Sequence, residues 1–286
     1  STLAQLYKRK TEGSYIGGPA YYMMFGLHKR WMARLYAVLI TITFCMAYIS
    51  IQSNTICGAM QGALGIQPWV MGLILVTLST ACVFGGINRI AKVSSIFVPV
   101  MAVLYILLAL VILAVNIQLV PRMFALIIEN AFGFRQFTGG TFGAMMMTGI
   151  KRGLFSNEAG EGSAACAASI ADVSHPVKQG LVQALSVFTD TLLICSCTAF
   201  IILLSGVYTD NSLNGIQLTQ TALQHEIGSV GPTFVAVAIF MFAFSSIIGN
   251  YTYGEMNVKF LTADHRWLTF VRVMNGIVMV MFGALA

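Results

Sequence analysis

Long stretches of apolar residues alternate along the chain with short polar segments. The apolar stretches cover about residues 33–59, 69–86, 93–115, 138–171, 178–206, 230–258 and 267–286. Each is close to or above the roughly 20 residues that an α-helix needs to cross the hydrocarbon core of a bilayer. The segments between them contain Gly, Pro or Asn, which favour turns. The pattern predicts about seven membrane-spanning helices.

Composition excludes a water-soluble domain. Hydrophobic residues make up 57% of the 286 residues and charged residues only 9%, against roughly 25% charged in a soluble domain. We therefore expect one all-α, polytopic transmembrane domain over residues 1–286. Residues 1–34 are polar and basic, with a Gly-Gly-Pro turn at Gly17–Pro19, and are expected to form a loop with short interfacial helices. Residues 35–286 are expected to form the helix bundle.

The net charge of +6 is best explained by membrane topology, not by binding to nucleic acid. When the loops are assigned alternately to the two sides, the side of residues 1–34 holds most of the basic residues, as cytoplasmic loops do. These are Lys8, Arg9, Lys10, Lys29, Arg30, Arg34, Arg89, Lys92, Lys178, Lys259 and Arg266, whereas the other side holds only Arg122 and Arg135. Residues 1–34 are therefore predicted to be cytoplasmic, and the amphipathic segment 121–132 to lie on the external interface.

The six cysteines fall almost entirely inside apolar stretches, where they act as small hydrophobic residues. Their spacing matches neither a disulfide framework nor a zinc site. We expect no cofactor.

The centre of the fourth apolar stretch, residues 149–163, is unusually polar for a membrane helix. It contains Lys151, Arg152, Asn157, Glu158 and Glu161 together with several glycines. Ionisable side chains at membrane depth must face a partner or water, and clustered glycines permit an unwound turn. One interpretation is a broken helix whose two ends bind a carboxylate and a small cation. The other is a cytoplasmic loop followed by a short re-entrant helix.

Residues 152–160, Arg-Gly-Leu-Phe-Ser-Asn-Glu-Ala-Gly, followed by Gly162-Ser163-Ala164, resemble the signature of the alanine or glycine:cation symporter family. Further likenesses occur in the same order along essentially the whole chain, at residues 17–22, 50–54, 190–191 and 244–255. The resemblance implies a leucine-transporter-like fold with inverted repeats. The seven stretches would then be helices three to nine, with helices missing at both ends. The chain alone is then expected neither to bind nor to transport alanine.

By this resemblance, the substrate site would include Gln52, Phe155, Ser246 and Asn250, and sodium would be bound by Ser245 and Ser246 together with the missing first helix. Each residue also has a structural interpretation. Gln52 could form a hydrogen bond between helices, the serines could bond to their own backbone, and Phe155 could be a core residue. Asn250 replaces the aromatic residue usual in the family's motif, which weakens the case for a strict alanine or glycine preference.

Charged residues provide candidates for coupling or gating. Asp190 lies near the centre of its predicted helix, where an isolated acid is a functional candidate. It could couple the cation, or pair with Arg152 or Lys151. Arg152 and Glu158 are the other candidates for coupling or gating. Glu255 is expected to form a gate or an interfacial ion pair.

The function implied is sodium-coupled symport of a small neutral amino acid, alanine or glycine, into the cell by alternating access. The site would be in the inner (plasma) membrane. Proton coupling and a channel-like membrane module remain alternatives, and the oligomeric state is open. Intramembrane hydrolysis is disfavoured because none of the four histidines lies deep inside a predicted span. We therefore expect a transporter and not an enzyme.

Overall fold

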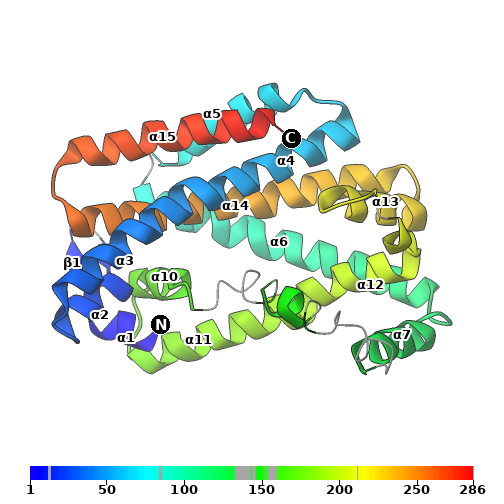
Figure 1. The fold of residues 1–286 in the computed structure, drawn as a ribbon, viewed down its shortest axis with the longest axis horizontal. Helices are drawn as coiled ribbons and strands as arrows, with labels where there is room; N and C mark the ends of the chain where they lie inside the picture. The colour runs from blue at the N-terminus through cyan, green and yellow to red at the C-terminus, as the bar shows by residue number, and fades with distance from the viewer. Residues whose placement is uncertain are drawn as a thin grey trace.

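The computed structural model describes residues 1–11, 14–83, 86–132, 143, 146–151, 153, 160–210 and 212–285. It is a helical bundle with one small β-hairpin (Figure 1). The helices are α1 (Thr2–Leu6), α2 (Pro19–Phe25), α3 (Arg30–Ile42), α4 (Ile49–Leu64), α5 (Pro68–Val83), α6 (Gly86–Val115), α7 (Val120–Phe132), α10 (Ser163–Ile170), α11 (Pro176–Thr189), α12 (Ser196–Ser205), α13 (Ile216–Ile227), α14 (Val230–Leu261) and α15 (His265–Ala284).

Two long helices each contain a π-helical segment. The first, η1 (Thr43–Tyr48), joins α3 to α4, and the second, η2 (Asp190–Cys195), joins α11 to α12. A 3₁₀ turn, η3 (Val207–Thr209), follows α12. Insertions of this kind inside α-helices are frequent at functional sites, and both lie at or beside residues that the sequence already made candidates.

Within the described residues, five helices are long and apolar enough to cross a membrane: Arg30–Leu64, Val98–Val115, Pro176–Ser205, Val230–Leu261 and His265–Ala284. They confirm five of the seven predicted spans and the all-α membrane class. The sixth, α5, is apolar but has only 16 residues. The remaining stretch, residues 138–171, is described only in part, at residues 143, 146–151, 153 and 160–171. Helix α7 coincides with the predicted segment 121–132, whereas α13 was not predicted.

Helices α4, α5, α14 and α15 pack into one apolar core (Figure 1). Glycine allows α15 to approach α4 and α5 closely: a Cβ on Gly283 would lie 3.0 Å from Cys57 Sγ and 3.4 Å from Gly72 Cα. Small residues at helix contacts are typical of membrane bundles. Ser53 Oγ adds a hydrogen bond across this contact, donated to the Met279 carbonyl at 2.7 Å.

A second core joins α6, α12 and α13 to α14. The buried Gln220 of α13 donates a hydrogen bond from Nε2 to the Ala59 carbonyl of α4 at 2.9 Å. The two cores therefore share α14, which runs with α4 through the middle of the molecule (Figure 1).

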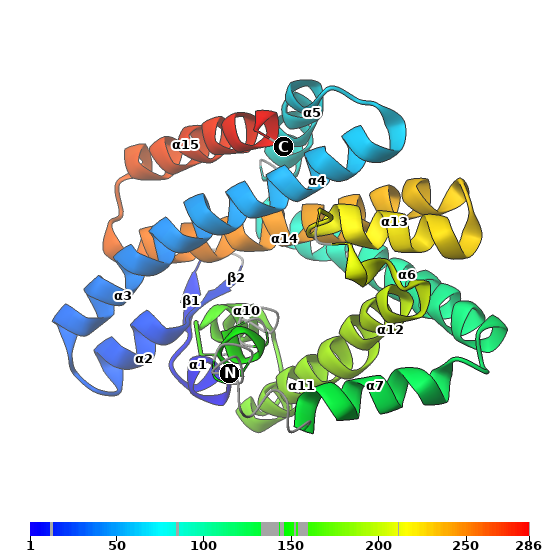
Figure 2. The ribbon, with the colours of Figure 1, turned by 45° about the vertical axis from the view of Figure 1, so that its right-hand side comes forward.

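The N-terminal segment is folded and packs on α10. Strands β1 (Arg9–Thr11) and β2 (Ser14–Ile16) form an antiparallel hairpin in which Arg9 pairs with Ile16. In Figure 2, α1 and the hairpin lie beside α10. The last carbonyls of a helix have no partner within it. Here Lys8 Nζ donates to the Ala171 carbonyl at 2.8 Å, and the buried Gln5 amide donates to the carbonyls of Ala168 and Ala171.

We predict that Gln5→Leu loosens α1 from α10. The change removes both amide hydrogen bonds, each of which contributes about 0.5–1.5 kcal/mol. The Ala171 carbonyl keeps its bond from Lys8, and the Ala168 carbonyl keeps its bond from the Ala171 N–H. Limited proteolysis of the membrane-embedded protein should show faster cleavage near residues 8–18. The exposed Gln67→Leu is the matched control and should leave the cleavage rate unchanged. Equal cleavage of Gln5→Leu and the unsubstituted protein would show that these hydrogen bonds do not hold the segment.

Candidate functional site

The polar fourth stretch enters the described structure as an unwound turn. Gly160 has φ +87° and Gly162 has φ +101°, backbone conformations that favour glycine. Helix α10 then begins at Ser163, with Gly162 as its N-cap. This turn fits a break in the fourth stretch just before residue 163. Arg152, Phe155 and Glu158 lie outside the described residues, so their proposed roles stay predictions.

Glu161, between the two glycines, is held by the α3–η1 helix. Tyr48 donates a hydrogen bond from its hydroxyl to Glu161 Oε2 at 2.5 Å. Tyr36 donates to the Glu161 backbone carbonyl at 3.0 Å. The sequence predicts that Glu161 faces a partner or water, but it does not identify the two tyrosines as those partners. The signal available was that Tyr48 lies four residues before Gln52, on the same helix face.

Two of the glycine-containing motifs pack directly against each other, although more than 140 residues separate them in the sequence. A Cβ on Gly162 would lie 2.1 Å from Tyr36 Oη and 2.7 Å from Pro19 Cγ. A Cβ on Gly18 would lie 2.8 Å from Cys166 Sγ. The motif at residues 17–22 therefore packs closely against the start of α10.

Aromatic rings connect this turn to α14. Phe44 stacks on Tyr48 with ring centroids 4.8 Å apart, and meets Tyr253 of α14 edge-on at 5.7 Å. Tyr253 also packs with Cys166 of α10 and with Tyr21 of α2 in one apolar cluster. Burial, assisted by the Cys166 thiol, raises the pKa of Tyr21 to about 12, so Tyr21 stays neutral.

The face of α14 that continues from Tyr253 holds the two predicted sodium ligands. Phe242, Ser245, Ser246, Gly249 and Tyr253 are half-buried and recur at helical spacing. Both hydroxyls donate to the Phe242 carbonyl, Ser245 at 2.7 Å and Ser246 at 3.1 Å. Because each hydroxyl hydrogen points to the backbone, the oxygen lone pairs remain available to an outside partner.

Asn250, on the same helix, is buried, and its Nδ2 has no hydrogen-bond partner among the described residues. A buried amide N–H without a partner is costly. Packing among the described helices therefore leaves this amide unsatisfied.

Gln52 is half-buried on α4, one turn beyond Tyr48 and on the same face. Its neighbours in the motif instead hold α15: Ser53 donates to Met279 and Asn54 donates from Nδ2 to the Phe282 carbonyl at 3.1 Å. Within the motif Ser50–Asn54, Ser53 and Asn54 therefore contact α15, whereas Gln52 lies on the face that continues from Tyr48.

The two acidic candidates in other helices have different surroundings. Asp190 is the first residue of η2, with Cys195 Sγ 4.0 Å from its Oδ2. Its proposed pairing with Arg152 lies outside the described residues, and Lys151 is exposed. Glu255 forms ion pairs with Lys259 at 2.7 Å and with Arg272 of α15 at 3.7 Å. This agrees with the expected interfacial pair.

Comparison with known proteins supports the membrane-transporter interpretation. A sequence profile of the sodium:alanine symporter family matches residues 1–286. The chain is 49% identical over its full length to the amino-acid carrier protein AlsT of Bacillus subtilis, covering 61% of that protein. It is 50% identical to the probable sodium/glutamine symporter GlnT of the same organism, covering 60% of it.

Over 79% of its length, the chain is 38% identical to a sodium/proton-dependent alanine carrier protein of Bacillus sp. PS3, covering 54% of that protein. The chain thus spans about 60% of the length of its two more similar relatives. These relatives are named as carriers and symporters, not as enzymes. The profile match over every residue, the relatives and the five membrane-spanning helices show that the chain is membrane-embedded and belongs to the sodium:alanine symporter family.

Proposed function

We propose that the protein is a secondary transporter that carries a small neutral amino acid into the cell together with sodium. Alanine or glycine is the proposed substrate, and the plasma membrane, with residues 1–34 in the cytoplasm, is the proposed location. Family membership and the names of the relatives support amino-acid symport in general. Because the chain covers about 60% of those relatives, this activity is proposed for the full-length protein.

The observation that carries the proposal is the unwound turn at Gly160–Gly162. It interrupts the fourth stretch beside the Tyr48–Gln52 face of α4 and leads into the N-terminus of α10. The first N–H groups of a helix have no partner within it and carry partial positive charge. Such an end is suited to the carboxylate of an amino acid, as in transporters whose sites lie at broken helices.

Ser245 and Ser246 supply hydroxyl oxygens for sodium on the α14 face. Hard cations such as sodium are bound by oxygen ligands, and two hydroxyls are too few on their own. The proposed site therefore needs further carbonyl oxygens, which the resemblance assigns to a helix outside this chain. Proton coupling is the alternative, since one relative is named for sodium or proton dependence.

Gln52 and Asn250 are proposed to contact the substrate. Asn250 Nδ2 has no partner among the described residues, so it can donate a hydrogen bond to the substrate. An amide at this position also accommodates a polar side chain better than an aromatic ring would. Alanine remains the proposed substrate, and glutamine, the amino acid in one relative's name, is the comparison that tests it.

Uptake by the full-length protein in proteoliposomes tests this proposal. We expect alanine uptake to require an inward sodium gradient and to exceed glutamine uptake. Ser246→Ala should raise the sodium concentration for half-maximal uptake at least tenfold, and Gln52→Ala should do the same for alanine. Each would correspond to a loss of about 1.4 kcal/mol of binding free energy.

Ser50→Ala is the control, because within the described residues the Ser50 hydroxyl donates its hydrogen bond to the Ala47 carbonyl of its own helix, at 2.8 Å. It should leave both concentrations unchanged. If a proton gradient without sodium drives uptake equally well, the coupling ion is the proton and not sodium. Ion currents without substrate uptake would contradict symport altogether.

A further inference from the structure

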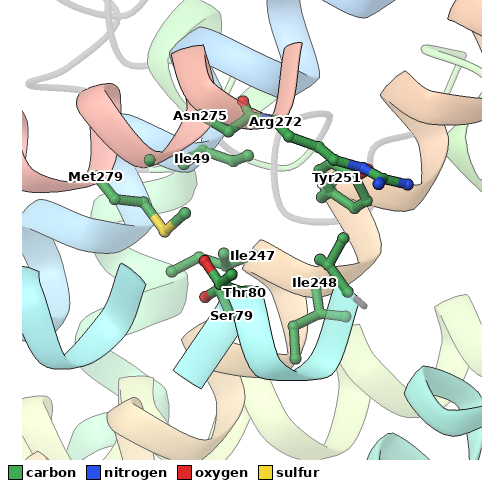
Figure 3. Close-up of a pocket in the computed structure, with 11 residues that line it drawn as sticks. Ile49, Ser79, Thr80, Ile247, Ile248, Tyr251, Arg272, Asn275 and Met279 are labelled. Atoms are coloured by element: carbon green, nitrogen blue, oxygen red, sulfur yellow. The ribbon is translucent and has the colours of Figure 1, made fainter. Parts of the chain in front are cut away.

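A small, mainly apolar cavity with a few polar side chains lies on the far side of α4 and α14 from the proposed transport site. Residues of α4, α5, α14 and α15 line it (Figure 3). Ile49 lines it from α4, next to Tyr48, which points to Glu161. Ile247 and Tyr251 line it from α14, on a face distinct from that of Ser246 and Gly249. The cavity is therefore separate from the Glu161 turn.

Two side chains that line this cavity have unsatisfied hydrogen-bonding atoms. Asn275 of α15 is 2% exposed, and within the part of the chain that the structure describes neither its Nδ2 nor its Oδ1 has a nitrogen or oxygen hydrogen-bond partner. Ser79 of α5 is 3% exposed, and its Oγ has no partner among the same residues. The Cys45 thiol lies within hydrogen-bonding reach of Asn275, but a thiol is only a weak donor and acceptor. Leaving such groups dry costs about 1–3 kcal/mol each.

The size of the cavity restricts what can fill it. The cavity volume is about 40 Å³. One water needs roughly 10–15 Å³. The space is sufficient for a few waters and too small for an amino acid.

The surrounding charge disfavours a cation. Arg272 lines the cavity and donates from Nε to the Tyr251 hydroxyl at 2.8 Å. Its guanidinium shares the single carboxylate of Glu255 with Lys259. Positive charge therefore exceeds negative charge beside the cavity, so a neutral ligand that both donates and accepts hydrogen bonds fits best.

We propose that this cavity is a structural water site, in which a few buried water molecules bridge Ser79 of α5 to Asn275 of α15. One water can accept from Asn275 Nδ2 or donate to its Oδ1, another can bond to Ser79 Oγ, and the waters can bond to each other across the cavity. Buried waters typically make about three such bonds to otherwise unsatisfied groups. The bridge fastens α5 to α15 beside the Tyr251–Arg272–Glu255 network.

Thermal unfolding of the purified full-length protein tests the bridge. Asn275→Leu keeps the number and branching of the side-chain heavy atoms but removes the two N–H donors and the carbonyl acceptor. With bridging water, it should lower the unfolding midpoint by about 2–4 °C. Ser79→Ala should lower it as well, and the double variant should lose less than the sum, because both residues hold the same group of waters. Thr77→Val is the control on α5, since Thr77 bonds to the Leu73 carbonyl of its own helix.

A dry cavity gives the opposite sign: Asn275→Leu would then raise the midpoint, because it removes an unsatisfied amide. A midpoint loss that grows with sodium concentration would indicate a cation instead and would also overturn the proposal. If Asn275→Leu fails to fold, Ser79→Ala and a high-resolution experimental structure still decide. Solvent density within hydrogen-bond distance of Asn275 and Ser79 supports the site, and an empty cavity contradicts it.

Discussion

Replacing Gly162 with alanine is expected to abolish transport and strongly reduce the amount of folded protein. The added Cβ would lie 2.1 Å from Tyr36 Oη and 2.7 Å from Pro19 Cγ, closer than real Cβ contacts occur. The backbone at φ +101° adds the strain of a left-handed conformation, about 1–2 kcal/mol. The start of α10 would have to move away from α2 and α3, and Glu161 would move with it. Uptake and the monodisperse yield after purification measure the effect.

Gly160→Ala separates the steric clash from the backbone strain. Gly160 has φ +87°, but a Cβ there would meet no atom within 4 Å among the described residues. This variant should therefore fold and retain most of the uptake. In the double variant Gly162→Ala with Tyr36→Phe, the closest atom is removed, so the yield should partly recover. Equal loss in Gly160→Ala and Gly162→Ala would show that strain, and not packing against Tyr36, dominates.

The hydrophobic pattern was sufficient to predict the long helices. Burial in lipid leaves few options for a stretch such as residues 230–258, so length and composition predict α14 to within a few residues at each end. Helix α13 was missed because its 12 residues include three glutamines, a histidine and a glutamate. It owes its place to tertiary contacts such as the one between Gln220 and Ala59.

The candidate site was only partly predictable for a related reason. Clustered glycines and charges at residues 149–163 indicated a break, because both are costly in an apolar helix. The partners of that break are distant in sequence: Tyr48 and Glu161 are 113 residues apart. Nor does local sequence specify a π-helical segment, since the residues of η1 are ordinary helix-compatible residues. Tyr48 and Gln52 both lie in the predicted span 33–59, but the contact between Tyr48 and Glu161 became evident only in the structure.

Tyr48→Phe is expected to reduce uptake by the full-length protein about 10- to 100-fold while leaving it folded. The variant retains the ring that stacks on Phe44, so the packing is preserved. It removes only the hydroxyl that donates to Glu161 Oε2. A hydrogen bond to a charged group contributes about 1.5–3 kcal/mol, which corresponds to this range if the bond is required to position the turn during transport.

Two matched variants show what the hydrogen bond does. Tyr36→Phe removes the bond to the Glu161 backbone carbonyl, a neutral acceptor, and should reduce uptake less. Glu161→Gln keeps an oxygen that can accept from Tyr48 but removes the charge. If Glu161→Gln transports normally, the bond acts by positioning the turn; if it is as impaired as Tyr48→Phe, the negative charge itself is required. Normal uptake in Tyr48→Phe would contradict both interpretations. It would show that transport does not depend on the hydrogen bond between Tyr48 and Glu161.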